Sequence, residues 1–501
     1  MSSFRWTFVG AIAVAALVAF TVYDNKRSHQ EEESKQQQLA LFKFKSDEIA
    51  KVDITTIYGE KVFEKKSENW KMLQPIADSA DEQTIRSLLN TFAAEKSLAT
   101  VAEKADPKND ATFGFDAPIS RVKLTTTDGR TEELKVGRVK AYDGSLYVRI
   151  DNDPKVLLAG QALGNQIDKQ ASEYRDKRLY RQSESGDSAK VSRFEIRQND
   201  PDNKTFPMEM AFEKNGESWK MTKGLTGNSD YPVLGDKVQA YLDQVKATRA
   251  LSFFPEAPKD KAAKPAAIDK PSMDIRLYAE KSSKPFFEID FGATKGKLTD
   301  VTAKSSDVDS VVTVYKAGVD SLKKHVDDFL DKKYPFDFKS DAVPLVTKIR
   351  ITTRDVKLDL VRKGLTWESA EPSAAPKEID NAKVDGLVAK LRQIEAVRIL
   401  EPIKKNQGNA KLKNESNIIL SQDSGEPVFE FSWGDAIIEK ASAGKPESKY
   451  YPAHTNLVAR LVGVSEFSVR SLELGSLVKQ SPASPTPGPK TSPTPRTGSG
   501  P

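Results

Sequence analysis

One pattern of apolar and polar positions recurs three times along the chain. A stretch of alternating apolar and charged residues breaks at a polar or glycine turn and resumes at a tryptophan, which predicts an antiparallel hairpin. The three stretches are 61–72, 211–221 and 359–369. Trp219 lies 149 residues after Trp70 (219 − 70), and Trp367 lies 148 residues after Trp219 (367 − 219). This even spacing indicates an internal repeat.

Each hairpin is followed by apolar residues at helical spacing. In the first copy, Ile85, Leu88, Leu89 and Phe92 fall three and four positions apart, so they share one face of a helix. The predicted helices are Asp81 to Ala94, Gly235 to Ala247 and Asn381 to Ile394. A later strand in each copy ends in a glycine, at Gly137, Gly292 and Gly434. The copies therefore share one order of elements.

These elements predict three tandem repeat units. The units are 39–181, 191–338 and 346–477, with a polar linker at 182–190. We expect the α+β class, with an N-terminal transmembrane helix followed by three repeats, each a mostly antiparallel sheet with packed helices. The last stretch, 481–501, consists mainly of Pro, Ser, Thr and Gly and is predicted to be disordered.

An apolar stretch lies near the N-terminus. Residues 6–23 contain no charged side chain, and as a helix of about 1.5 Å per residue they would just reach across a bilayer core. Trp6 and Tyr23 stand where interfacial aromatic residues are found. A cleaved signal peptide is the alternative, but no small-x-small site borders the stretch, so we favour an uncleaved anchor. Residues 24–38 are polar and are predicted to form a stalk.

The charge balance restricts the class of partner. The chain of 501 residues has 77 basic and 72 acidic side chains, interspersed, with a net charge of +5. This distribution lacks the one-sided basic field that nucleic-acid binding needs, so we expect no nucleic-acid partner. There is no cysteine, which excludes disulfides, thiolate metal sites and cysteine nucleophiles.

Candidate catalytic motifs are weak throughout the chain. His29, His325 and His454 are the only histidines, and they occur in unlike settings, so neither a nucleophilic triad nor a histidine-based zinc site is indicated. GATKGK at 292–297 lacks the spacing and the Ser or Thr of a phosphate-binding loop. The Asp-Asn-Asp run at 151–153 lacks the Gly and distal Glu of a calcium loop. We therefore assign no catalytic, cofactor-binding or metal-binding residue.

Two further features have both a functional and a structural interpretation. Trp70, Trp219 and Trp367 could contact a sugar or a partner, but a tryptophan that closes the same hairpin in three copies is more simply a core residue. The basic stretch 174–181 (YRDKRLYR) could contact lipid headgroups, but its internal aspartate favours a solvated helix end.

The order of motifs resembles a known family. The first unit contains ITTIYG, SENWKMLQP, FGFDAP, KVGR, LYVRI and YRDKRLY, and this order resembles a repeated extracytoplasmic domain of unknown function associated with gliding-motility-type (Gld-like) ABC transporters. The tyrosine-glycine-leucine usual in that family is replaced by Phe113-Gly114-Phe115 in this chain. The second unit keeps Trp219 and Gly292, and the third keeps Trp367 and Gly434 but lacks the Asp-x-Pro turn.

The resemblance implies a non-enzymatic accessory protein without cofactors. We expect a scaffold of an ABC-type transport or gliding-motility-like complex, located at the bacterial inner membrane as a single-pass protein with most of the chain in the periplasm. Its expected partners are ABC transporter membrane subunits or other envelope proteins, and the lipid bilayer through residues 6–23. The alternative is an envelope ligand-binding protein that holds a polysaccharide or an exported substrate in a groove lined by Trp433, Tyr450 and Tyr451. An enzyme that uses carboxylates is a third possibility.

Overall fold

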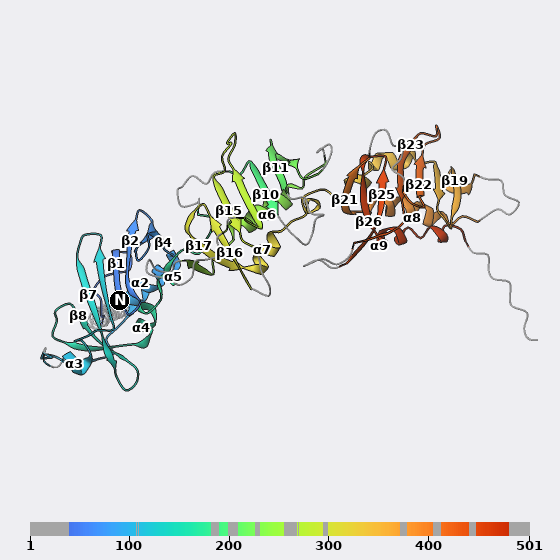
Figure 1. Ribbon diagram of the computed structural model, residues 1–501. Helices are drawn as coiled ribbons and strands as arrows, with labels where there is room; N and C mark the ends of the chain where they lie inside the picture. Colours follow the sequence, from blue (N-terminus) through green and yellow to red (C-terminus); the bar gives the residue numbers. More distant parts are fainter. Residues whose placement is uncertain are drawn as a thin grey trace, which may run out of the picture. The chain divides into compact units, whose positions relative to one another are not determined.

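Three antiparallel sheets dominate the computed structural model (Figure 1). The structure describes residues 40–479, apart from 107, 109, 182–189, 199–208, 226–230, 255–267, 269, 294–298, 371–377, 404–411 and 440–446. The predicted stalk, linker and C-terminal tail lie outside the described residues.

Each sheet is built from strands that follow one another in space as follows. The first sheet is β4 (Asp78–Ser79), β3 (Asn69–Gln74), β2 (Gly59–Lys66), β1 (Ile49–Thr56), β6 (Ser120–Thr126), β7 (Thr131–Lys140), β8 (Leu146–Ile150), β9 (Val156–Ala159) and β5 (Ala99–Ala102). The second is β12 (Ser218–Lys223), β11 (Glu209–Asn215), β10 (Arg193–Gln198), β14 (Met273–Tyr278), β15 (Phe287–Phe291), β16 (Asp300–Ser305), β17 (Val308–Tyr315) and β13 (Ser252–Phe254). The third is β20 (Thr366–Ser369), β19 (Lys357–Lys363), β18 (Lys348–Thr352), β22 (Ser416–Ser421), β23 (Pro427–Trp433), β25 (Ser448–Thr455), β26 (Val458–Ser465) and β21 (Ala396–Pro402), with β24 (Ile437–Glu439) paired to β25.

All three sheets have the same strand order. The hairpin that closes at the tryptophan forms one edge, and the strand that follows the helix forms the opposite edge, so the chain crosses the sheet through that helix. The turn of this hairpin has a positive φ at the same position in each copy, at Ser67 (55°), Gly216 (63°) and Gly364 (62°). Positive φ at this position suits the twist of a tight hairpin, and glycine adopts it without strain.

The helices are short and few. The α-helices are α2 (Glu82–Ala94), α3 (Asp110–Phe113), α4 (Gln161–Ile167), α5 (Ala171–Tyr174), α6 (Gly235–Lys246), α7 (Lys316–Leu322), α8 (Asn381–Arg392) and α9 (Glu466–Ser471). The 3₁₀ turns are η3 (Val326–Asp328), η4 (Tyr334–Phe336), η5 (Ser340–Leu345) and η6 (Leu474–Ser476). Asp81 caps α2 by accepting a hydrogen bond from the backbone N–H of Thr84 (2.8 Å). The predicted bounds of the three long helices are correct to within one or two residues.

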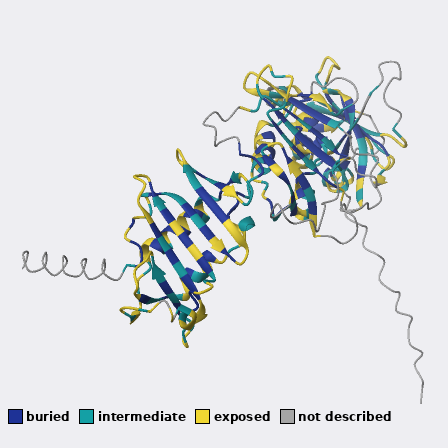
Figure 2. Cartoon of the chain, turned by 60° about the vertical axis from the view of Figure 1, so that its left-hand side comes forward, coloured by how far each residue is buried: buried dark blue, intermediate teal, exposed yellow. Residues whose placement is uncertain are grey.

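The core of the first repeat lies between one face of its sheet and helix α2. Ile85, Leu88, Leu89 and Phe92 of α2 are buried, as their spacing predicts. Along β6, buried and exposed residues alternate, so one face of the sheet packs on the helix and the other faces solvent. Figure 2 shows this alternation of dark blue and yellow along the strands of the first sheet.

The structure contradicts the predicted α+β class. Antiparallel sheet makes up most of the described structure, and each sheet carries one helix of only 12 or 13 residues. The stretch 319–330, expected to form an amphipathic helix, divides into the end of α7 and the single turn η3. Hairpins, not helices, bury most of the apolar surface.

The structure also contradicts the predicted membrane helix. Residues 6–23 lie outside the described residues. Within the described part of the chain, no helix is long and apolar enough to cross a membrane. The longest, α2, has 13 residues, whereas a bilayer core needs about 20. The expectation of a single-pass inner-membrane protein is therefore not supported.

The chain divides into two compact units that do not coincide with the repeats. One contains the described residues of Met1–Ala189, Gln244–Pro271 and Phe287–Ser321. The other contains those of Lys190–Asp243, Ser272–Phe286 and Leu322–Pro501. The first unit therefore holds the first sheet together with β13, β15, β16 and β17 of the second. The predicted repeat boundaries remain predictions.

Candidate functional site

The main cluster of buried charged residues in the first compact unit surrounds residues 174–181, which we call the joint segment. Arg175, Asp176 and Arg181 are 1%, 2% and 7% exposed. Helix α5 ends at Tyr174, and the chain continues in an extended conformation from Arg175. The prediction of a solvated helix end is therefore wrong. The partners of these charges lie about 100 residues or more away in sequence, and local composition does not reveal them.

Asp78 holds two arginines of the joint segment. Its Oδ2 lies 2.7 Å from Nε of Arg175, and its Oδ1 accepts a hydrogen bond from Nη1 of Arg181. The Asp78 side chain is only 9% exposed. The backbone N–H of Asp176 donates to the carbonyl of Ser79 (2.9 Å), so the segment also pairs with the edge of the first sheet. Both side chains and backbone therefore fix the segment to β4.

The same segment contacts strands of the second sheet. Nη2 of Arg175 donates to Oγ of Ser310 (2.7 Å), and its guanidinium stacks 3.8 Å from the ring centroid of Phe253. The hydroxyl of Ser305 donates to the carbonyl of Leu179 (2.6 Å). These contacts lie within the first compact unit. They join β4 to β13 and to the β16–β17 hairpin.

The charges of this cluster compensate one another. Burial opposes ionisation of the Asp176 carboxyl, but hydrogen bonds from Arg178 and the charges of Arg178 and Arg181 prevail and lower its pKa. Asp307 accepts a hydrogen bond from the backbone N–H of Arg181 (2.7 Å). Three arginines (175, 178, 181) therefore face three aspartates (78, 176, 307). The cluster retains no net charge that would recruit a charged ligand.

A second joint in the other compact unit has the same backbone pattern. In the first joint, the N–H of Ala250 donates to the carbonyl of Lys177 (2.7 Å). In the second, the N–H of Ala396 donates to the carbonyl of Lys332 (2.8 Å). Both alanines lie between the long helix of a repeat and the last strand of its sheet. The chain therefore enters the second and the third repeat in the same way.

The second joint uses aromatic packing where the first uses ion pairs. Thr455 Oγ1 donates to the carbonyl of Pro335 (2.7 Å), as Ser305 does in the first joint. Beside it, the ring of Phe338 stacks on that of Phe429, with centroids 4.5 Å apart. The backbone pattern is thus common to the two joints, whereas the side chains differ.

The histidines occupy structural positions. The imidazole of His325 caps η3 by accepting from the N–H of Asp327 (3.3 Å), whose carboxylate in turn accepts from the N–H of Ile399 (3.1 Å). Burial lowers the pKa of His454, which lies 3.8 Å from the carboxylate of Glu415. His29 lies outside the described residues. Where the structure describes the chain, no group of three or more His, Cys, Asp or Glu side chains could hold a metal ion.

The repeated tryptophans are mainly core residues. Trp70 and Trp367 are 6% and 3% exposed, which confirms the prediction for these two. Trp219 is half-buried and packs edge-on against Phe194, with centroids 5.6 Å apart. In the first and third repeats, the backbone N–H of the tryptophan donates to the first side chain of the following helix. Gly235 occupies that position in the second repeat, so this bond cannot form there.

The structure does not form the aromatic groove expected from Trp433, Tyr450 and Tyr451. Trp433 and Tyr450 are both 6% exposed, and Trp433 stacks on Phe431. Tyr450 and Tyr451 are consecutive in β25, so their side chains point to opposite faces of the sheet. Trp433 contributes to a hollow at one end of the third sheet, but neither tyrosine lines it.

The two weak motifs form no phosphate or calcium site in the described structure. Asp151 and Asp153 shape a turn, because their carboxylates accept from the N–H groups of Glu133 (2.8 Å) and Lys155 (3.0 Å). The GATKGK stretch falls mostly outside the described residues, at 294–298. Gly292, at its start, donates its N–H to the carbonyl of Thr302 as a strand residue does.

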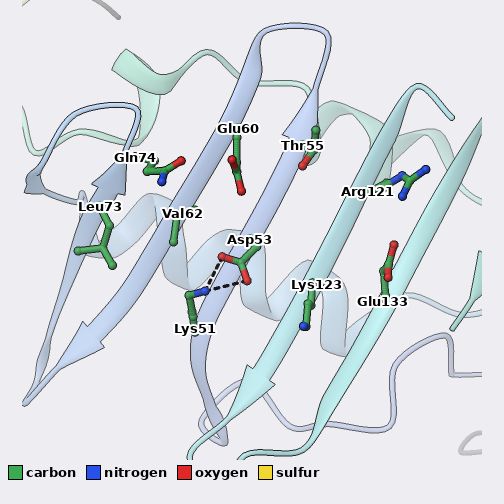
Figure 3. Close-up of a pocket in the computed structure, with 10 residues that line it drawn as sticks. All are labelled: Lys51, Asp53, Thr55, Glu60, Val62, Leu73, Gln74, Arg121, Lys123 and Glu133. Atoms are coloured by element: carbon green, nitrogen blue, oxygen red, sulfur yellow. Dashed lines mark hydrogen bonds and ion pairs between the residues drawn. The ribbon is translucent and has the colours of Figure 1, made fainter. Parts of the chain in front are cut away.

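The outer face of the first sheet has a hollow of about 500 Å³. Figure 3 shows that side chains from β1, β2, β3, β6 and β7 project into it from the face opposite α2. Three cations (Lys51, Arg121, Lys123) and three carboxylates (Asp53, Glu60, Glu133) line it, together with Thr55, Val62, Leu73 and Gln74. Lys51 pairs with Asp53 (2.9 Å). This mixed-charge, open surface suits contact with a polar protein surface.

A comparison with protein families identifies the repeat. The family described as Domain of unknown function (DUF4340) matches twice, at 70–263 and at 219–415. Each match begins at a repeated tryptophan and continues through the joint into the next repeat. No curated protein and no solved structure matches the chain significantly. Because the matches together span 346 of the 501 residues (415 − 70 + 1), the chain belongs to the DUF4340 family of domains of unknown function.

Proposed function

We propose that this protein is a non-catalytic scaffold of an ABC-type transport or gliding-motility-like complex, acting through protein contacts of its repeats. The observation that carries the proposal is the use of the buried polar cluster. Arg175 and Arg181 are satisfied by Asp78, Ser310 and the backbone, so the cluster holds neighbouring sheets together. Catalytic groups, by contrast, face a cavity that a substrate can enter.

The outer face of the first sheet supplies a surface for partner contact. Arg121 and Lys123 are exposed and lie two positions apart on β6, so they project from the same face. The exposed Leu73 lies on the same hollow. A mixed rim with an apolar residue is the usual composition of a non-obligate protein interface. The resemblance of the motif order to transporter-associated domains favours transporter subunits as the partner.

Crosslinking in cells of the source organism tests the proposal. The full chain is crosslinked and purified, and recovered proteins are identified by mass spectrometry. We expect transporter subunits with the natural sequence, and their loss with the double variant Arg121→Glu, Lys123→Glu. The matched control, Arg354→Glu with Lys357→Glu, makes the same charge change at exposed positions of the third repeat. Recovery of no transporter subunit with the natural sequence contradicts the proposal.

A further inference from the structure

Every repeat closes on itself with the same backbone pattern. The residue before the long helix forms an isolated bridge with a residue near the end of the repeat, and the next residue donates its N–H to the neighbouring carbonyl. The bridges are Ala80–Arg175, Val233–Leu330 and Ile379–Val478. The hydrogen bonds are Asp81 to Tyr174 (2.7 Å), Leu234 to Phe329 (2.8 Å) and Asp380 to Leu477 (2.9 Å). We call 174–176, 329–331 and 477–479 the closing segments.

In the second and third repeats, residues from the end of the preceding repeat cover the last strand of the sheet. Phe253 of β13 is fully buried beneath the guanidinium of Arg175. Ile399 of β21 is 5% exposed and donates its N–H to the carboxylate of Asp327, just before the second closing segment. The two residues occupy the same register position, because Phe253 pairs with Val312 and Ile399 with Val462.

The corresponding strand of the first repeat is exposed. Thr100 of β5 pairs with Leu157, which is the same register position, and it is exposed. β5 is the last strand of its sheet, and in the described structure it pairs with β9 alone. Leu98 and Val101 beside it are 62% and 42% exposed. No closing segment among the described residues covers this edge.

The third closing segment has the geometry of the other two. Lys479 donates its N–H to the carbonyl of Glu378 (2.8 Å), as Asp176 does to Ser79 (2.9 Å). In the first repeat this geometry precedes contact with the next sheet. The side chains of Glu378 and Lys479 are 71% and 51% exposed. The described residues thus contain one such closing segment and one receiving edge that do not meet in a joint.

We propose that the edge of β5 receives the third closing segment of a second copy of this chain. The contact would repeat the geometry of the two joints within one chain. Charge favours it, because Lys155 lies two residues before Leu157, where Ser310 stands in the first joint, and faces the acidic Glu378 of the second copy. Since the two surfaces differ, the contact is heterologous and joins copies head to tail. An unpaired strand edge with apolar side chains is a ready template for such pairing.

Crosslinking between copies tests this contact, because the natural chain contains no cysteine. One tagged copy of the full chain carries Thr100→Cys, and a second copy with another tag carries Lys479→Cys. We expect a bis-maleimide to link the two copies. The control replaces Thr100→Cys with Val139→Cys, on a strand residue of similar exposure (37%, against 42% for Val101) away from this edge. Adding Val101→Lys to the Thr100→Cys copy should lower the yield to that of the control.

A crosslink yield with Thr100→Cys no higher than with Val139→Cys overturns the proposal. An unchanged yield after Val101→Lys, in a protein that retains its melting temperature, also overturns it. Either result leaves the proposed contacts with transporter subunits unaffected, since those use a different face of the first repeat.

Discussion

Removal of the Asp78 carboxylate should strongly destabilise the first compact unit. In Asp78→Ala, Arg175 and Arg181 lose their common anion while 1% and 7% exposed. Breaking a buried ion pair by removing one partner costs about 3–5 kcal/mol, because a buried charge is left uncompensated. The matched control is Asp116→Ala, whose partner Arg138 lies 3.0 Å away and is 53% exposed. An exposed pair contributes about 0–1 kcal/mol.

Urea denaturation followed by tryptophan fluorescence measures both effects. With an m value of about 2–3 kcal/mol/M, the midpoint of Asp78→Ala should fall by roughly 1–2 M, and that of Asp116→Ala by less than about 0.5 M. The double variant Asp78→Leu, Arg175→Met should recover part of the loss, because apolar residues of similar volume replace a buried pair at little cost. Equal midpoints for Asp78→Ala and Asp116→Ala would refute the assignment of Asp78 as the anchor of the joint.

Three further predictions concern the repeats themselves. Gly137→Ala should destabilise the protein, because a Cβ there would lie 2.0 Å from a backbone carbonyl oxygen, whereas Gly386→Ala, with open space around it in α8, should stabilise it by about 0.5–1 kcal/mol; thermal unfolding compares the two. Burial lowers the pKa of Lys61 to about 8 from 10.5, so the folded state binds fewer protons than the unfolded state between these pH values. The stability of the natural protein relative to Lys61→Met should therefore rise from pH 7 to pH 10, and a fall measured by urea titration would contradict the burial. Phe338→Ala should cost about 3–5 kcal/mol, because the ring is 2% exposed and stacked, and Phe467→Ala, 81% exposed, should change stability by less than about 0.5 kcal/mol.

The sequence contained enough information to predict the repeated elements. Hydrophobic spacing placed the three long helices, and alternation placed the hairpins, because both patterns depend on neighbours within one element. The order of strands could not be derived in this way. The pairing of β1 with β6 brings together residues some 70 positions apart, such as Ile54 and Val122, and no local pattern specifies that partner.

The joint segment was misinterpreted for the same reason. A run with three arginines, one lysine and one aspartate is typical of a solvated surface, and the anion that neutralises two of its arginines, Asp78, lies about 100 residues earlier. The alternation of Tyr174, Leu179 and Tyr180 with these charges was the available indication of burial, since all three are at most 7% exposed. The proposed groove failed on simple geometry, because Tyr450 and Tyr451 are adjacent in a strand.

Hydrogen–deuterium exchange of the joint segment tests most directly whether successive repeats are joined by a buried segment. The N–H groups of Asp176, Leu179 and Ala250 donate to backbone carbonyls at 2.9, 3.1 and 2.7 Å. If the joint is part of the folded core, these amides exchange as slowly as those of β1 and β6, and Asp78→Ala accelerates all three together. Exchange at the rate of an exposed loop in the natural protein would contradict the joint and the scaffold that depends on it.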